Sequence, residues 1–368
     1  MDDESIFDQL FRLLQSSGPV NWKIAREVTK SLAGSVEPVE PAVAEEYREL
    51  AHMAELRIDA TSDLPARAAA EELNPTDRAT WAADNQQAFR LLVEPLADKL
   101  GAGMEIPGAT GSMGAMLQPL GPALLGMQAG TMIGFMSQRI LGQFDSGIPA
   151  MDHERPYLVV PNVAQFSFEN SFDDRQVRLW AAMHEMAFHR LMAIEWLRGH
   201  FVSLITSFYD TVEFDVSGLM GRLGNLEDPA QMDALLSAEG ESGVPPLLRG
   251  DADPDRLAAV QAFIAFVEGY GDHLVRAAGA QLMHDLDHIE AAYSLRRSEP
   301  DQAEQFLQQM AGLELQRHRA SDAAAFCVEV KHRWGEDALA RVWEEPDRLP
   351  TRDELTDPVG WAARVLLD

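Results

Sequence analysis

The chain has 368 residues, of which 46% are hydrophobic and 24% are charged, as in ordinary globular proteins. This length is enough for one large core, and the composition excludes a wholly disordered chain. The formal charge is −29, from 59 acidic and 30 basic residues, so the surface should repel nucleic-acid phosphates and anionic membranes. We therefore expect neither nucleic acid nor a membrane among its partners.

Two features of the sequence indicate the compartment. Cys327 is the single cysteine, so a disulfide within the chain is excluded, which fits a reducing environment and a buried free thiol. The first residues, MDDESIFDQLFRLL, are acidic and lack the basic and then apolar order of a signal peptide. Both features predict a cytoplasmic protein.

Apolar residues recur at helical spacing through most of the chain. In the first hundred residues this pattern predicts helices at 4–16, 20–33, 41–60 and 76–100. Either Thr76 or Asp77 is a suitable cap for the fourth helix, because both side chains can accept a backbone N–H bond.

An uncharged stretch follows at residues 106–138. It is long enough to span a bilayer, but prolines and glutamines interrupt it. Gly126, Gly130 and Gly134 recur at every fourth position, which places them in one stripe on a helix and allows close helix packing. We expect a buried core helix here and no membrane span.

The second half of the chain contains the best strand candidate, residues 156–168, where a β-branched apolar run is followed by alternation. A long helix is expected at about 174–200, a flexible surface loop at 238–254, a helix at 255–282, and short helices with proline-marked turns at 323–367. The sequence thus predicts a single multi-helix domain over residues 1–368, mainly α with a small β element.

The segment WAAMHEMAFHRLM, residues 180–192, nearly spells the H-E-x-x-H motif of zinc proteases. That motif works because residues i and i+4 lie only about 40° apart around a helix, so two histidines can grip one ion. Here Phe188 stands at i+4 from His184, and His189 at i+5 lies about 140° away in a regular helix. A π-bulge could bring His189 into register; otherwise His184 and Glu185 are an ordinary hydrogen-bonded histidine beside an acid.

The segment FVEGYGDHL places Glu268 and Asp272 four residues apart on one helical face, in apolar surroundings. In one large class of zinc peptidases, a downstream E-x-x-x-D supplies the third metal ligand and a residue that orients a zinc histidine. Alternatively, Glu268 and Asp272 are surface residues that form salt bridges with basic side chains. His284 and His288, flanked by aspartates, offer a second possible two-histidine clamp.

Several segments together resemble the actinobacterial zincin-like metallopeptidase family, whose members are described as hydrolases of unknown substrate. They run in order along nearly the whole chain: PVNWKIAREV, LLGMQAGTMIGFMSQRILGQFDSGIP, VVPNVAQF, RLWAAMHEMAFHRLMAIEWLRGH, VEGYGDH and VWEEPDRLPTRDELTDPVGWAAR. The resemblance implies a zincin-like fold with a gluzincin-type active-site helix. It also implies His184 as first zinc ligand, Glu185 as general base, Glu268 as third ligand and Asp272 as a residue of the second shell.

The sequence departs from the family pattern at Phe188, where the second zinc ligand should stand. Losing one of three protein ligands weakens zinc binding severely. His189 and His273 are the possible substitutes, though neither lies in register. We therefore predict a degenerate zinc site with zinc absent or weakly bound, in a pseudo-enzyme that binds an unknown protein or peptide. The alternative is an active zinc-dependent hydrolase that uses His184, Glu268 and a shifted ligand such as His189.

Overall fold

Helices make up most of the chain in the computed structural model, which describes residues 18–62, 64, 72–103, 120–145, 156–212, 253–298 and 319–367. The long helices are α2 (Trp22–Ala33), α3 (Pro41–Thr61), α4 (Arg78–Gly103), α6 (Leu120–Arg139), α7 (Val160–Asn170), α8 (Asp174–Met192), α9 (Glu195–Tyr209), α12 (Pro254–Gly279), α13 (Leu286–Ser298) and α15 (Arg319–Trp334). The chain ends in short α16 (Glu336–Ala340), the 3₁₀ turns η1 (Arg341–Trp343), η2 (Pro346–Arg348) and η3 (Glu354–Thr356), and α17 (Pro358–Val365).

A small sheet completes the fold. Strands β1 (Asn74–Thr76) and β2 (Tyr157–Val159) run parallel, and Pro75 pairs with Leu158. An antiparallel bridge from Gly142 to Leu158 adds the segment that follows α6. The predicted fold class, mainly α with a small β element, is confirmed.

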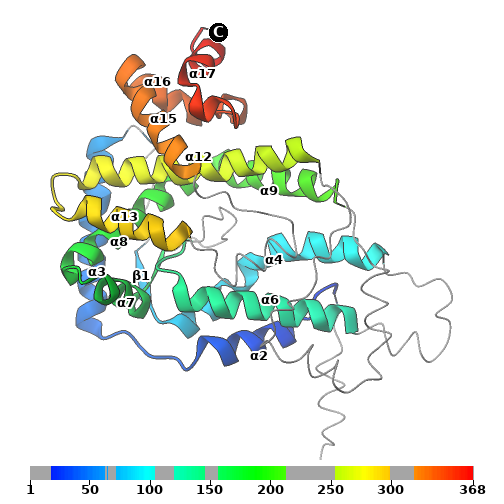
Figure 1. Ribbon diagram of the computed structural model, residues 1–368. Coiled ribbons are helices and arrows are strands. Elements are labelled where there is room, and N and C mark those ends of the chain that lie inside the picture. Colours follow the sequence, from blue (N-terminus) through cyan, green and yellow to red (C-terminus); the bar gives the residue numbers. More distant parts are fainter. Residues whose placement is uncertain are drawn as a thin grey trace, which may run out of the picture.

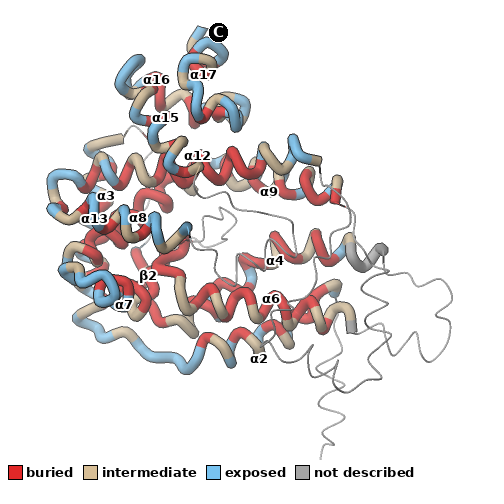
Figure 2. Tube along the Cα trace, in the orientation of Figure 1, coloured by how far each residue is buried: buried red, intermediate tan, exposed pale blue. Residues whose placement is uncertain are grey.

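The helices form two packed groups (Figure 1). Helices α2, α4 and α6 contact one another on one side, while α12 packs against α3, α8 and α9 on the other. The β pair lies between them, since β2 contacts both α4 and α8. Helix α15 packs on the outer side of α12 and carries α16 and α17. Figure 2 shows that α8 and α12 are buried over much of their length, which places them at the centre of the core.

The glycine stripe of the uncharged stretch lies in the interface between α6 and α2. A Cβ on Gly126 would lie 2.2 Å from the carbonyl oxygen of Asn21, and one on Gly130 would lie 2.4 Å from that of Ala25. A Cβ on Gly134 would lie 2.6 Å from the Cβ of Leu32. The stripe is therefore a helix-packing surface in the core, as expected for the part of the stretch that is described. No helix among the described residues is both long and apolar enough to cross a bilayer.

The strand predicted at 156–168 is wrong beyond residue 159. After β2 the chain turns into α7, whose first turn contains Pro161, a residue favoured at helix starts because it needs no N–H partner there. Val163, Phe166 and Ser167 are buried, which is helical spacing and not alternation. Strand β1 was not predicted.

The long helix predicted at 174–200 is divided. Helix α8 ends at Met192, and Ile194 adopts an extended backbone (φ −70°, ψ 114°) before α9 begins. This break turns α9 onto α12, where Phe201 stacks on Phe263 with 5.7 Å between ring centroids. No glycine or proline at the break marks the end of α8 in the sequence. The break is decided by tertiary packing, including that of Phe201 on Phe263.

The remaining predictions concern the cap of α4, the thiol of Cys327, and residues 4–16 and 238–254. Asp77, not Thr76, caps α4, because its carboxylate accepts the backbone N–H groups of Ala79 and Thr80. The thiol of Cys327 is buried and free. The helix expected at 4–16 lies outside the described residues, as does the loop at 238–254 except for its last two positions, where Asp253 caps α12.

Candidate functional site

Helix α8 carries the histidine–glutamate motif through the centre of the core. Asp173 caps its N-terminus by accepting the N–H of Gln176, and the helix is regular from Asp174 to Met192. His184, Glu185, Phe188 and His189 are all buried. Because α8 contains no π turn, His184 and His189 point about 140° apart around the helix axis and do not converge on one point.

Phe188 packs directly on His184. Their ring centroids are 4.5 Å apart and their planes differ by 28°, so the two rings are stacked. On its other sides Phe188 meets Phe144 and the backbone of α12 at Gly271, where a Cβ would lie 2.4 Å from the phenyl ring. The position four residues after His184 is thus filled by a buried ring that packs on His184, Phe144 and Gly271.

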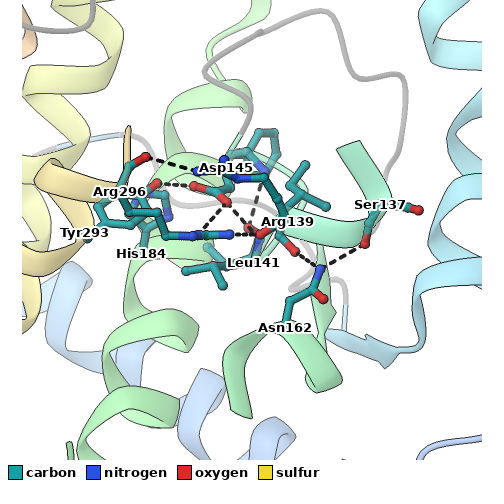
Figure 3. Close-up of polar contacts among 11 residues, drawn as sticks. Ser137, Arg139, Leu141, Asp145, Asn162, His184, Tyr293 and Arg296 are labelled. Atoms are coloured by element: carbon teal, nitrogen blue, oxygen red, sulfur yellow. Dashed lines mark hydrogen bonds and ion pairs between the residues drawn. The ribbon is translucent and has the colours of Figure 1, made fainter. Parts of the chain in front are cut away.

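The other side of His184 faces α13 (Figure 3). Its Nε2 lies 3.3 Å from the hydroxyl oxygen of Tyr293, and that hydroxyl donates its hydrogen to the carboxylate of Asp145. Since Tyr293 has only one hydroxyl hydrogen, the contact assigns the proton of the neutral imidazole to Nε2, which donates to Tyr293. A nitrogen that carries a proton has no lone pair for a metal ion.

Asp145 is the charged end of this network. Its second oxygen accepts the backbone N–H of Leu141 at 2.8 Å and lies 3.6 Å from the guanidinium of Arg296. Burial alone would raise the pKa of Asp145, but Arg296, the Tyr293 hydroxyl and the Leu141 N–H together lower it. Burial also lowers the pKa of His184, to about 4, although Asp145 opposes the shift. Asp145 is therefore charged and His184 neutral near pH 7.

Glu185 is held by the backbone rather than by a second side chain. Its carboxyl accepts N–H groups from Gln143 at 3.0 Å, from Tyr157 at 3.3 Å and from Phe144 at 3.4 Å. Gly142 leaves room for it, because a Cβ there would lie 2.3 Å from Glu185 Oε2. Burial raises the pKa of Glu185 well above its usual value, and the three N–H donors oppose that rise. The carboxyl thus ties α8 to the segment after α6 and to β2.

Glu268, the expected third ligand on α12, forms an ion pair with Arg297 of α13. Both side chains are buried, with exposed fractions of 1% and 11% respectively. The Arg297 guanidinium also lies over the ring of Tyr293, 5.1 Å from its centroid, and its charge contributes to the lowered pKa of His184. A fixed guanidinium therefore supplies the positive charge between Glu268 and the Tyr293–His184 network.

The remaining sequence candidates form no hydrogen bond or ion pair with His184 in the described part of the chain. Asp272 lines a cavity between α12, α13 and α15, together with Tyr293 and Arg297 of the cluster. His273 lies beside Tyr270 and near α15. His284 and His288 are exposed side chains that share Asp285, and His284 precedes α13, so the two are not one turn apart on a regular helix.

The side chains present do not fit a zinc ion in this arrangement. Among the residues that the structure describes, no group of three or more histidine, cysteine or acidic side chains is placed to hold a metal. His184 presents a protonated nitrogen to Tyr293, Phe188 fills the neighbouring position, and Glu268 is bound to Arg297. No metal-dependent step can be derived from this geometry.

Comparison with known proteins identifies the family of the chain. Residues 20–362 match the zincin-like metallopeptidase family. The chain belongs to this family. The match confirms the relationship inferred from the motifs, while the actinobacterial origin stays a prediction.

A solved structure shares the fold of this zincin-like chain. It is described as "a putative hydrolase with a novel fold from Chloroflexus aurantiacus", is 23% identical, and superposes with a TM-score of 0.66 over 95% of this chain and 99% of its own. At this identity the likeness concerns the fold. No curated protein matches the zincin-like chain.

Sequence reasoning did not find the residues that surround the motif. Asp145 lies in one of the segments that carried the resemblance, but nothing local marks it as a partner of Tyr293, which is 148 residues away. Arg296 and Arg297 are adjacent arginines near the end of α13, where basic residues are common because of the helix dipole. Only their burial in the folded chain distinguishes them.

Proposed function

We propose that this zincin-like protein has lost the zinc site of its family's active-site helix and acts without metal, as a binding or regulatory protein. The observation that carries the proposal is the pairing of Glu268 with Arg297, a buried internal cation, beside a His184 that is stacked on Phe188. A buried carboxylate needs one positive partner, and a guanidinium satisfies that need without a metal.

Two of the obstacles to zinc in this arrangement, Phe188 and the ion pair of Glu268 with Arg297, can be removed separately. Phe188→His combined with His189→Gln restores the family spacing of the two histidines. Adding Arg297→Met frees Glu268 from its guanidinium. If both obstacles matter, the variant that lacks Arg297 should bind zinc more tightly than the variant that retains it.

The decisive experiment measures zinc per chain by elemental analysis after chelation and dialysis against buffered zinc. Exposed His284 and His288 could hold adventitious zinc, so both are changed to Gln in every protein tested. We expect far less than one zinc per chain for the parent protein and close to one for the variant with Phe188→His, His189→Gln and Arg297→Met.

The alternative, or rival, function is an active zinc-dependent hydrolase that uses His184, Glu268 and His189. Family membership is the observation in its favour. Stoichiometric zinc in the parent protein, lost on His184→Ala, on Glu268→Ala and on His189→Ala, would establish the rival. Peptide hydrolysis that tracks zinc content would do the same. Stoichiometric zinc that survives all three substitutions would contradict both the proposed loss of the zinc site and the alternative hydrolase.

A further inference from the structure

A cavity of about 590 Å³ lies between α12, α13 and α15, on the outer side of the cluster around His184. Its polar lining includes Trp180, Asp272, Glu290 and Arg297. Exposed residues such as Ala325 also line it, so the cavity opens at the surface. Its size lies within the range of small-molecule sites in proteins.

Three side chains of this cavity have a buried polar atom that no hydrogen bond satisfies among the described residues. They are the indole Nε1–H of Trp180, the Nε–H of Arg297 and the Oε1 of Glu290. An unsatisfied buried group costs about 1–3 kcal/mol, so such groups are rare and call for an explanation. Two donors and one acceptor around one cavity indicate a ligand that offers both kinds of group.

The charges of the cavity leave one carboxyl without a partner in the described structure. Arg297 pairs with Glu268, and Arg276 pairs with Asp287 and Glu290. Asp272 is half-buried and has no hydrogen bond or ion pair within the described ranges. A cationic group of a ligand would complete its pairing, with Glu290 Oε1 as a second acceptor.

We propose that this cavity binds the amino end of an α-amino compound: a free amino acid or the first residue of a peptide. The ammonium group is held by Asp272 and Glu290, and the neighbouring carbonyl or carboxylate oxygen accepts from Trp180 Nε1 and Arg297 Nε. Val275, Ala324 and Val328 supply apolar wall for an aliphatic side chain of the ligand.

This inference goes beyond the proposed function and does not depend on it. The cavity is lined by residues of α8, α12, α13 and α15 other than His184 and Glu268, and ligand binding there needs no metal. Calorimetry of the intact protein in the presence of a chelator therefore tests the cavity alone, and its failure would leave the zinc measurements unaffected.

The experiment titrates the full chain with four related probes. L-leucine and L-leucinamide carry the ammonium group and the oxygen, whereas N-acetyl-L-leucinamide lacks the ammonium group and 3-methylbutylamine lacks the oxygen. The dipeptide Leu-Ala distinguishes the two sources, because a site for peptide ends accepts it as well as leucinamide, while a site for free amino acids prefers leucine.

We expect saturable binding of one leucine-type probe per chain and about tenfold or greater weakening for each of the two truncated probes. Asp272→Asn should weaken binding of leucinamide by a similar factor. Its matched control is Glu329→Gln on α15, which makes the same change of charge at a residue outside the cavity and should leave the affinity unchanged.

Other outcomes overturn the proposal. Equal affinity for the acetylated probe would show that no ammonium group is recognised, and the absence of binding below about 10 mM for every probe would show that this class of ligand is wrong. If Asp272→Asn unfolds the protein, Ala325→Trp provides a second route, because it adds bulk at the exposed rim of the cavity. Binding that survives this substitution would place the ligand elsewhere.

Discussion

The phenyl ring of Phe188 lies against the imidazole of His184, with 4.5 Å between the ring centroids. One turn of α8 separates the two residues, which is the spacing that two zinc-binding histidines would need. The stack makes this face of the helix a part of the hydrophobic core, and the stability of the protein should depend on it.

Phe188→Ala tests this dependence. The phenyl ring is 2% exposed and packs on His184, Phe144 and Gly271, so its loss should lower the free energy of unfolding by about 3–5 kcal/mol. Chemical denaturation measures the change. Phe168→Ala is the matched control, because Phe168 is 85% exposed and its loss should change the free energy of unfolding by less than about 0.5 kcal/mol. Similar effects of the two substitutions would contradict the packing described here.

The ion pair of Glu268 and Arg297 predicts strong coupling between the two residues. Arg297→Gln leaves a buried carboxylate without its partner and should cost about 3–5 kcal/mol. Glu268→Gln in addition should restore a large part of this loss, because the double variant buries no unpaired charge. A double-mutant cycle from denaturation curves gives the coupling. Arg276→Gln is the control, since its side chain is 52% exposed and the change should cost no more than about 1 kcal/mol.

Gly142 is a position at which a single methyl group should disturb the site. Its Cβ would lie 2.3 Å from Glu185 Oε2 and 3.0 Å from the carbonyl oxygen of Tyr157, so Gly142→Ala should destabilise the protein by about 1–3 kcal/mol. Gly199→Ala is the matched control in the exposed middle of α9, where a Cβ meets no atom within 4 Å. That change should stabilise the protein by about 0.5–1 kcal/mol. A neutral result at Gly142 would mean that the Glu185 carboxyl can move aside.

Asp145 predicts stability that is lost in acid. Its folded-state pKa is lowered from the usual 3.8, so the folded protein binds this proton less readily than the unfolded chain. The stabilisation is present above pH 3.8 and disappears as the pH falls through the folded-state pKa. Asp145→Asn should therefore be less stable than the parent protein at pH 7, and the difference should shrink below pH 3.8. Denaturation curves from pH 7 to pH 3 measure it, and a difference that is constant over this range would contradict the assignment.

Asp272 predicts the opposite sign. Burial, with the charges of Glu268 and Glu290, raises the pKa of Asp272 to about 7 against the pull of Arg297 and Arg276. The folded protein therefore keeps a proton that the unfolded chain releases above pH 3.8, and stability falls as the pH rises from 3.8 through 7. Asp272→Asn lacks this loss. Without added amine, its stability relative to the parent protein should increase between pH 4 and pH 8, which denaturation at several pH values detects. A relative stability that falls with pH would show that Asp272 is paired as an anion.

The sequence by itself determined the features that depend on near neighbours in the chain. Helical spacing predicted most of the helices, because burial of residues i, i+3 and i+4 is a local pattern. The same spacing put Gly126, Gly130 and Gly134 on one packing face of α6, and the order of motifs identified the family. It also showed that Phe188 stands four residues after His184, where the H-E-x-x-H motif has a histidine.

Only the tertiary structure decided what surrounds that position. The partners of His184 and Glu268 come from α13, and Glu185 is held by N–H groups of the segment after α6 and of β2. The turn of residues 160–170 into α7 and the break after Met192 were likewise decided by packing. Ion pairs, ring stacks and backbone–carboxylate bonds join elements that lie far apart in sequence, and no periodicity records which of them will meet.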